Sequence, residues 1–569
     1  MFDPALPFVL LDDVSTGRAR LFSEALEQVI AVAPEAVPHA LAQLRTPGAW
    51  AGFVGFEAGY ALEKVLPHRL APIGEPLLWF GRFARDEAVD VAALLGTGPA
   101  IVGEFAVGLT QPDYDARLAQ VQALISAGDI YQANLTFNAA VAVGGHPVHL
   151  YARLRGGSRA PYGALLFTGS LWVLSFSPEL FFRLEGRTVM AKPMKGTAVR
   201  GVDAADDAAR AAALAADPKN RAENLMITDL LRNDLSRVGD NVQVPALFAV
   251  ETYPTILQMT STITATAHAG VGAADVLMRL FPCGSVTGAP KIRAMQVIAE
   301  VEAATRGVYT GSIGAISANG DAVFNVAIRT LVMTPGAATA RLGLGSGIVA
   351  DSESALEFAE CLAKAKFLHR RGPPDLIETL RAEDGDLPDI ERHLSRMAAS
   401  ARFLGTVFDS PAARALLRQA ASGCSGRVRL VAALSGALAV QVAPLPAILK
   451  GAVRVAVAAL PVDTDDWRLR HKTSDRAFYD RARAAAGTFE VVFVRPDGAL
   501  TEGSFTNIFV QRGALLLTPP AHLGLLPGVL RARLLDTGAA VEADLTAGDL
   551  GNGFFIGNAL RGLLPAVLI

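Results

Sequence analysis

The sequence is poor in cysteine: the three in 569 residues, Cys283, Cys361 and Cys424, lie far apart and form no CxxC pair. This scarcity argues against a disulfide framework and a structural zinc site, and it favours a reducing compartment. An excess of either charge is also missing, because 52 lysines and arginines nearly balance 55 acids. The basic residues are scattered and form no stripe, so we expect no nucleic-acid partner and no acidic membrane partner.

Long apolar runs are missing too. Residues 160–178 and 430–449 lack charged side chains, but Gly, Pro and Ser interrupt both of them. Each is therefore predicted to form strands joined by turns, with no membrane span. The first residues carry acids where a secretory signal carries a basic region, so we expect a soluble, cytoplasmic protein.

The length of the chain predicts two to four domains. Its sharpest break is RRGPP at residues 370–374, which follows a helix-like segment ending in basic residues. Proline pairs stop a helix and stiffen a linker. We therefore predict one domain over residues 1–369, a linker at 370–374 and a second domain over 375–569. Strand-like and helix-like segments occur in both, which predicts an α+β fold class.

A hairpin is predicted where LFFRL and TVMAK flank an EGR turn, within residues 180–192. Glu179 precedes the first strand and Lys195 follows the second, so the hairpin brings both to the same edge. An exposed salt bridge is the plainer interpretation. The functional one is a general acid beside a nucleophilic amine, which loses its proton through partial burial or a cationic neighbour.

Two predicted helices carry acids, at residues 221–235 and 354–366. Their polar positions are Glu223, Asp229, Asn233 and Asp234 on the first, and Glu357, Glu360 and Lys364 on the second. Carboxylates from two helices that converge with an oxygen-rich substrate suit Mg²⁺. Solvated acidic faces explain the same pattern without a ligand.

Between these helices, residues 281–300 place glycines and a proline before a helix, where free N–H groups can hold an anion. This segment is not a P-loop, because Ile292 follows Lys291 where a Ser or Thr is needed and the glycine spacing differs. A carboxylate is the expected guest. Arg329, in the predicted strand AIRTL, is its expected bidentate partner.

Together and in this order, these segments resemble the chorismate-utilising enzymes, the family of anthranilate, isochorismate and aminodeoxychorismate synthases. The matching segments are GDIYQANLT (128–136), SPELFF (177–182), PMKGT (193–197), ENLMITDLLRNDL (223–235), FPCGSVTGAPKIRAM (281–295), YTGSIG (309–314), AIRTL (327–331), GSGIVADS (345–352) and EFAECLAK (357–364). Anthranilate synthases look like PIAGT where this chain has PMKGT. A lysine at that position marks the aminodeoxychorismate synthases.

The resemblance implies a chorismate-utilising-enzyme fold, a two-sheet β core flanked by helices, with chorismate as substrate and Mg²⁺ as cofactor. It implies that Lys195 adds at C2 while Glu179 assists loss of the C4 hydroxyl, and that ammonia then adds at C4 and expels the lysine. Glu223 and Glu360 would hold Mg²⁺. The residues implied to grip the substrate carboxylates are Gly288, Ala289, Tyr309, Arg329, Gly347 and Lys364.

In residues 1–369, one position departs from the family pattern and the source of ammonia has to be identified. Gln258 stands where several relatives have histidine, so the polar contact at that position is open. No Cys–His glutaminase pattern is visible. A partner glutamine amidotransferase subunit is therefore expected to supply ammonia, unless free ammonia does so.

The second half contains Lys472 in WRLRHKTSDRAFYDRAR (467–483), between a predicted strand and a helix. A lone lysine is usually a surface residue, but TEGSFTNIFV (501–510), LLPGVLRARLL (525–535) and FFIGNALRGLLPA (554–566) follow it. A pyridoxal-phosphate site needs a Schiff-base lysine, an acid on the pyridine nitrogen, and N–H groups or arginine on the phosphate. The candidates are Lys472, Glu502, the Gly528–Val529 turn and Arg396.

That set resembles the fold-type IV pyridoxal-phosphate enzymes, which include branched-chain and D-amino acid aminotransferases and aminodeoxychorismate lyases. The resemblance implies an α+β domain of branched-chain aminotransferase type. In it Lys472 is the Schiff base and proton shuttle, Glu502 is the pyridine partner, and Arg396, Val529 and Asn558 bind the phosphate beside Gly528. The likeness covers about residues 376–566 and lacks the opening strands and glycine-rich turn usual before ETLR (378–381). Because such sites usually lie at dimer interfaces, a homodimer is expected.

The neighbouring domain decides between substrates. A lyase joined to the enzyme that makes its substrate predicts amination of chorismate to 4-amino-4-deoxychorismate, then elimination of pyruvate to 4-aminobenzoate, in folate biosynthesis. Three alternatives remain. The first half could be another chorismate enzyme such as an anthranilate synthase, against which Lys195 argues. The second half could be an amino-acid aminotransferase, or a non-catalytic dimerisation or docking module.

Overall fold

The computed structural model describes residues 3–72, 74–96, 98–201, 204–253, 256–369, 374–433, 436–449, 451–551 and 553–569. Of the predicted linker at 370–374, only Pro374 is among them. The chain forms two compact units: unit 1 comprises Met1–Ala198, Ala211–Thr252 and Ile256–Gly372, and unit 2 comprises Val199–Arg210, Tyr253–Thr255 and Pro373–Ile569. None of the described helices is both long enough and apolar enough to cross a bilayer.

Unit 1 is rich in strands. They are β1 Phe8–Asp13, β2 Arg18–Ala31, β3 Ala49–Val54, β4 Leu78–Ala88, β5 Ala100–Val107, β6 Gln132–Gly145, β7 Tyr162–Phe167, β8 Trp172–Ser177, β9 Leu180–Glu185, β10 Thr188–Lys192, β11 Met194–Val199, β12 Gly239–Thr252, β13 Ile256–Ala267, β14 Gly288–Ala289, β15 Ser312–Ile316, β16 Ala322–Asn325, β17 Thr330–Met333 and β18 Thr339–Ile348. Antiparallel pairs connect one series β1–β7–β8–β17–β18–β6 and another β4–β3–β15–β16–β9–β10–β13.

The two series pack face to face as two layers. Alternate residues of a strand point to opposite faces, so the side chains of one strand are divided between two cores. In β1, Val9 belongs to a core shared with Phe53 of β3, whereas its neighbours Phe8 and Leu10 belong to a different core on the outer side. Trp50 and Val54 of β3 turn outward into a third core. The predicted two-sheet β core is therefore confirmed, with the addition that the β2–β4 pairing joins the layers.

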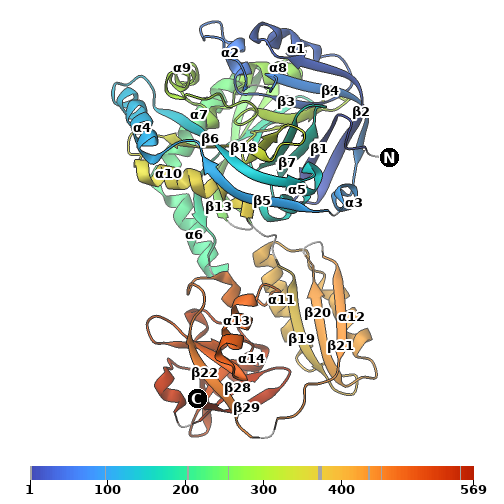
Figure 1. Ribbon diagram of the computed structural model, residues 1–569, viewed down its shortest axis with the longest axis vertical. Coiled ribbons are helices and arrows are strands. Elements are labelled where there is room, and N and C mark those ends of the chain that lie inside the picture. The colour runs from blue at the N-terminus through green and yellow to red at the C-terminus, as the bar shows by residue number, and fades with distance from the viewer. Residues whose placement is uncertain are drawn as a thin grey trace. The chain divides into compact units, whose positions relative to one another are not determined.

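Helices cover the outer faces of these layers (Figure 1). They are α1 Val37–Gln43, α2 Ala58–Leu62, α3 Val91–Leu95, α4 Gln111–Ser126, α5 Pro147–Ser158, α7 Pro218–Ser236, α8 Ala273–Leu280, α9 Lys291–Val301 and α10 Ser354–Ala363. Short 3₁₀ turns occur at η1 Pro34–Ala36, η2 Gly284–Val286 and η3 Lys364–His369. Helix α6 Ala204–Ala216 is divided between unit 1 and unit 2. The start of α7 follows from its sequence. Pro218 occupies the first turn and the Asp217 side chain accepts a hydrogen bond from the Asn220 N–H.

Most segments predicted from the sequence form as expected, and two details differ. The hairpin β9–β10 pairs as predicted. Lys195 follows its second strand, as predicted, and lies within the next strand, β11. Arg329 precedes β17 in a left-handed conformation, with φ of 51°, so it is not a strand residue. Asp234 is buried against Lys291, so it does not belong to a solvated acidic face.

Unit 2 contains two sheets. The smaller is an antiparallel sheet of β19 Leu376–Ala382, β20 Gly426–Ala432 and β21 Leu438–Ala443. The larger is mixed and comprises β22 Val453–Ala459, β23 Glu490–Val494, β24 Leu500–Gly503, β25 Asn507–Arg512, β26 Leu515–Thr518, β27 Ala540–Glu542, β28 Phe554–Asn558 and β29 Gly562–Leu568. The helices are α11 Ile390–Leu404, α12 Ser410–Ala421, α13 Ala477–Ala486 and α14 Val529–Asp536, with 3₁₀ turns η4 Trp467–Leu469, η5 Ala521–Leu523 and η6 Ala547–Leu550.

Arg306 is a buried side chain with many partners, and 2% of its surface is exposed. Its guanidinium donates to both carboxylate oxygens of Glu302, to the Val286 carbonyl before β14 and to the Asn134 carbonyl in β6. The Arg306 N–H donates in turn to Glu57. One buried cation thus connects segments that are distant in the sequence.

We predict that Glu302→Gln lowers the free energy of unfolding by about 3 kcal/mol or more, because it leaves the buried guanidinium without its anion. Chemical denaturation of the purified chain measures this. Glu300→Gln is the matched control on α9: its side chain is 61% exposed and lies 3.6 Å from Arg293, so its effect should stay within about 0.5 kcal/mol. Equal effects of the two substitutions would contradict a stabilising role for the buried Arg306–Glu302 ion pair.

Candidate functional sites

One face of β18 is bare at alternate positions, where Gly343, Gly345 and Gly347 occur. A Cβ at Gly343 would lie 2.1 Å from the Tyr309 ring, and a Cβ at Gly347 would lie 3.0 Å from Lys195 Nζ and 2.7 Å from Gln132 Nε2. Side chains from other elements therefore fill the space that the glycines leave. This face is the floor of the unit 1 site.

Lys195 is the common neighbour of the predicted acids. Its charge acts on three carboxyls: it opposes the rise that burial causes in the pKa of Glu179 and Glu223, and it contributes to the lowered pKa of Glu360. Among the described residues Lys195 has no salt bridge within 4.0 Å, so the exposed-salt-bridge interpretation of Glu179 and Lys195 is wrong. Lys195 is thus half-buried and, within the described part of the chain, not engaged in an ion pair.

Glu179 is 4% exposed, and its Oε1 is buried with no hydrogen-bond partner. Burial raises the pKa of its carboxyl from 4.5 to about 7, against the opposing effects of the Ser285 hydrogen bond and of the charges of Lys195 and Lys364. A carboxyl with this pKa is partly protonated at neutral pH, so it can act as a general acid.

The loop before α9, residues 281–290, is predicted from the sequence to bind an anion and is called here the anion loop. It lies against β6. Gly288 and Ala289 form β14 and pair with Ala133 and Gln132. Lys291 is already paired within the protein: its Nζ donates to Asp234 at 2.5 Å and to the Leu280 carbonyl at 2.8 Å. It is therefore not placed like the phosphate-binding lysine of a P-loop.

Lys364 and Glu360 form an ion pair at 2.8 Å, and Lys364 Nζ also donates to the Gly345 carbonyl at 2.8 Å. Lys364 therefore lies at the glycine face of β18. Burial raises the pKa of Glu223 on α7. For Glu360 burial also acts upward, but the charges of Lys364 and Lys195 outweigh it and its pKa is lowered. The Arg329 carbonyl accepts a hydrogen bond from the Phe176 N–H at 3.1 Å.

Two residues of this site were missed or left open at the sequence level. Gln132 is fully buried, and both polar atoms of its side chain lack a partner. The pairing of β6 with β18 brings it to Gly347, which also lies next to Lys195, so spacing alone could not reveal it. Gln258, the departure from the family pattern, accepts from Thr197 Oγ1 and donates to the Gly196 carbonyl. It thus fixes the backbone next to Lys195.

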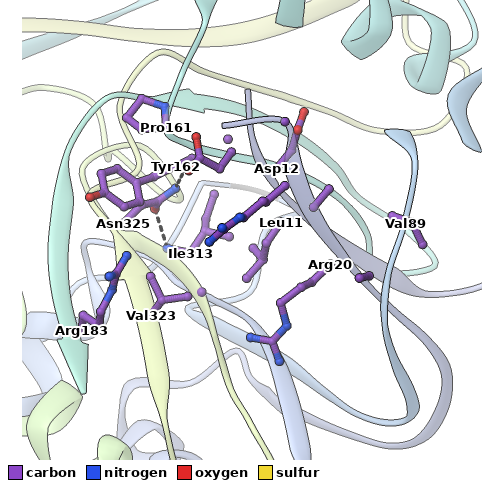
Figure 2. A pocket seen from close by; sticks show the side chains of 17 residues that line it. Leu11, Asp12, Arg20, Val89, Pro161, Tyr162, Arg183, Ile313, Val323 and Asn325 are labelled. Atoms are coloured by element: carbon purple, nitrogen blue, oxygen red, sulfur yellow. Dashed lines mark hydrogen bonds between the residues drawn. The ribbon is translucent and has the colours of Figure 1, made fainter. Parts of the chain in front are cut away.

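A cavity of about 670 Å³ lies elsewhere in unit 1. Figure 2 shows its wall, with Leu11, Ile313 and Val323 beside the charged Arg20 and Arg183. Asn325 stabilises the wall, accepting from the Ile313 N–H and donating to the Tyr162 carbonyl. None of the site residues predicted from the sequence lines this cavity, so it is separate from the Lys195 site.

In unit 2 the predicted residues come together around one cavity of about 460 Å³, called here the unit 2 cavity. Those that line it are Arg396, Lys472, Glu502, Gly528, Val529 and Asn558. Ile377 of β19 donates its N–H to the Lys472 carbonyl, and Leu376 pairs with Thr473. The small sheet therefore holds the segment that carries the lysine.

Lys472 lies 3.8 Å from Glu378, and its side chain is 22% exposed. Burial lowers the pKa of the amine to about 8; Arg396, Arg476 and Arg429 act in the same direction, and Glu378 opposes them. Glu378 is itself 1% exposed and takes two hydrogen bonds from Arg396, at 2.8 Å and 2.7 Å, while His393 Nδ1 lies 2.6 Å away. Neither Glu378 nor His393 was predicted as a site residue.

Glu502 is 2% exposed and accepts a 2.6 Å hydrogen bond from Tyr479 Oη. Burial raises the pKa of Glu502 to about 7. At Gly528 a Cβ would lie 1.9 Å from Asn507 Oδ1, so glycine is required where α14 begins. The Asn558 side chain bonds the backbone of Phe505, Leu560 and Arg561, so it shapes a turn of the cavity wall.

Both parts of the chain match known protein families. Residues 11–370 match the chorismate binding enzyme family, and residues 375–569 match the amino-transferase class IV family. Aminodeoxychorismate synthase component 1 of Klebsiella aerogenes is 41% identical over 265 residues, which cover 46% of this chain and 58% of that relative. Anthranilate synthase component 1 of Streptomyces coelicolor is 40% identical over 261 residues, covering 45% of this chain and 51% of that relative.

Among solved structures, anthranilate synthase component I of Streptococcus pneumoniae superposes with a TM-score of 0.55 at 24% identity, covering 65% of this chain and 94% of that one. This similarity shows the fold of the first part of the chain. The chain spans little more than half the length of the curated relatives it matches. Relatives of two different activities are almost equally identical, so identity alone does not separate those activities.

We predict that Glu179→Gln stabilises the chain above pH 7 and leaves its stability nearly unchanged near pH 4.5. The folded-state pKa is about 7 against 4.5 for an ordinary glutamate. The folded state therefore binds more protons between these values, and stability falls as pH rises through them. The cost of the buried carboxylate reaches about 3 kcal/mol above pH 7.

Denaturation at both pH values measures this difference. The matched control is Glu185→Gln at the far end of β9, where the side chain is 68% exposed; it should change little at either pH. A Glu179→Gln variant that is no more stable than the parent above pH 7 would mean that the carboxyl is not buried in its charged form.

Proposed function

The chain belongs to the chorismate binding enzyme family and carries an amino-transferase class IV domain after it. On this basis we propose that it makes 4-aminobenzoate from chorismate in two steps. Residues 1–369 aminate chorismate to 4-amino-4-deoxychorismate, and residues 375–569, after a linker at 370–374, eliminate pyruvate from that product. The observation that carries the proposal is Lys195, an amine that lies at the glycine face of β18 and forms no salt bridge with any residue that the structure describes.

Lys195 favours aminodeoxychorismate synthesis over anthranilate synthesis, the two activities named among the relatives. Its Nζ attacks C2 of the ring and the double bonds shift, so the C4–O bond breaks and the hydroxyl leaves as water. Ammonia then bonds to C4, the electrons shift back, and the bond between C2 and Nζ breaks. An anthranilate synthase needs no lysine nucleophile at this position, so the chain is proposed to be an aminodeoxychorismate synthase.

Glu179 is the proposed acid for the first departure. It is buried and partly protonated at neutral pH, so its proton is available to the leaving hydroxyl. Gly288, Ala289, Tyr309, Gly347 and Lys364 are proposed to hold the substrate carboxylates; Arg329 is added on the resemblance alone.

Mg²⁺ fits the acids of this site. No group of three or more metal-ligating side chains occurs among the described residues. Glu223 on α7 and Glu360 on α10 both lie within the influence of Lys195 and Lys219. Two carboxylates completed by substrate oxygens and water are a usual donor set for Mg²⁺. The ion would offset the charge of the substrate carboxylates.

The nitrogen is proposed to come from a glutamine amidotransferase subunit, in keeping with the designation "component 1" of the relatives. The cysteines support this, because Cys283 and Cys361 are buried and burial raises the pKa of both thiols. Such thiols are poor nucleophiles.

The unit 2 cavity fits pyridoxal phosphate. Arg396 and the first N–H groups of α14 suit its phosphate, Glu502 suits the ring nitrogen, and Lys472 suits its aldehyde. The cofactor, when bound, supplies an electron sink next to the substrate amine. Glu378 holds Arg396 and lies beside Lys472. With a pKa of about 8, Lys472 is available to move the proton from C4. A homodimer is proposed on the resemblance alone.

A second candidate concerns unit 2 only. The matched family is named for aminotransferases, so transamination of an amino acid is the alternative to elimination of pyruvate. A non-catalytic module is a further alternative, and it predicts that the purified chain binds no yellow cofactor.

The test is an assay of the purified chain with chorismate, Mg²⁺, pyridoxal phosphate and ammonium, followed by mass and by fluorescence. We expect 4-aminobenzoate and pyruvate in equal amounts. Accumulation of aminodeoxychorismate would support the first step and refute the lyase. Formation of anthranilate would refute the role of Lys195.

Two lysine variants separate the halves. Lys195→Ala should abolish chorismate consumption and keep the cofactor absorbance, whereas Lys472→Ala should keep amination and lose that absorbance. Lys192→Ala is the control, because Lys192 is ion-paired with Glu251 of β12; it should retain most of the activity. Unchanged chorismate consumption by Lys195→Ala would contradict the proposed nucleophile.

A further inference from the structure

The unit 2 cavity has more positive charge than a cofactor phosphate needs. Beyond Lys472 and Arg396, five arginines line it: Arg427, Arg429, Arg476, Arg483 and Arg561. Among the described lining residues there are two carboxylates, Asp480 and Glu502. Asp480 lies 3.4 Å from Arg483, and Glu502 is partly neutral at neutral pH. The cavity therefore retains a cationic excess for a further anion.

Three of these arginines are half-buried and have no carboxylate within 4.0 Å in the described part of the chain: Arg429, Arg476 and Arg561. Half-buried arginines elsewhere in unit 2, such as Arg468 and Arg495, have acidic partners. Burying a cation without an anion is costly. The unpaired ones thus indicate that a ligand provides the missing negative charge.

Two elements direct these cations toward Lys472. Arg427 and Arg429 alternate along β20, so they share one face of the small sheet, and Thr379 opposite Arg429 lines the same cavity. Arg476 comes four residues after Lys472. Its Nη2 donates to the Ser504 carbonyl, while its Nη1 is buried without a partner. The charges of Arg429 and Arg476 both reach the lysine.

We propose that Arg429 with Arg427 binds one carboxylate, and Arg476 a second, of a doubly charged substrate, so that the unit 2 cavity selects dicarboxylates over monocarboxylates. Guanidinium groups bind carboxylates in bidentate fashion, so two separate groups suit two separate carboxylates. The inference rests on the proposed function in one respect: 4-amino-4-deoxychorismate carries two carboxylates, on its ring and on its side chain. A neutral-chain amino acid, the substrate of the alternative aminotransferase, carries one.

The test measures binding to the full chain loaded with pyridoxal phosphate. Benzene-1,3-dicarboxylate and benzoate are titrated separately, and the change in visible absorbance of the cofactor reports binding near Lys472 only. We expect the dicarboxylate to bind at least about tenfold more tightly than benzoate. Equal dissociation constants in the unaltered chain would overturn the inference without any variant.

Substitution identifies the side chains. Arg429→Met should raise the dissociation constant of the dicarboxylate at least about tenfold and that of benzoate by less, and Arg476→Met should do the same. Arg429→Lys should recover part of the preference, since it keeps the charge. Arg418→Met on α12 is the control, because Arg418 is exposed and does not line the cavity. Loss of dicarboxylate preference in Arg418→Met, or its retention in both cavity variants, would refute the assignment.

Failure of the lyase and failure of this inference give different results. A chain that makes no 4-aminobenzoate but loses dicarboxylate binding on Arg429→Met has the binding site and another reaction. A chain that makes 4-aminobenzoate but binds both probes equally has the lyase without the proposed carboxylate recognition.

Discussion

The buried guanidinium of Arg306 is the interaction on which the unit 1 site depends. It binds Glu302 and two main-chain carbonyls, one before β14 and one in β6. These are the segments that carry Gly288, Ala289 and Gln132. A buried ion pair is favourable only when its remaining donors and acceptors are satisfied, and here backbone carbonyls take the remaining donors. The cation therefore determines where the anion loop lies relative to the strand beside it.

Burial shifts the pKa of ionisable groups in both units. It disfavours the charged form of any group, so it raises the pKa of Glu179 and Glu502 to about 7 and lowers that of Lys472 to about 8. The pKa values of the two acids thus rise toward neutral pH, and the pKa of the amine falls toward it. Proton transfer in either unit then requires little free energy near neutrality. The cost is stability, since each group would be more favourable in water in its ordinary state.

The elements with strong local patterns were predictable from the sequence. The β9–β10 hairpin, α7, α9 and α10 follow from alternation, helical spacing and caps. Arg329 was assigned to a strand because its neighbours are apolar, and its left-handed backbone left no trace in that pattern. Asp234 was assigned to a polar face because spacing cannot reveal a buried partner such as Lys291.

The residues missed in the two sites have a common cause. Gln132 and Glu378 each lie in a segment whose importance was recognised, but their roles depend on strands and helices that pack from elsewhere in the chain. Lys472 and the other cofactor residues predicted from motifs do meet at one cavity. Motif order therefore indicated the chemistry, whereas the groups that hold the motifs required the fold.

The bare face of β18 also restricts how such a chain can evolve. A methyl group at position 347 would displace the Gln132 amide and crowd Lys195 Nζ, so the effect of a lysine at 195 depends on which residue occupies 347. Both atoms are the ends of flexible side chains, so a methyl group would shift them and change where the amine lies without altering residue 195. The two positions are therefore expected to be coupled, and a substitution at either one has to be judged together with the residue at the other.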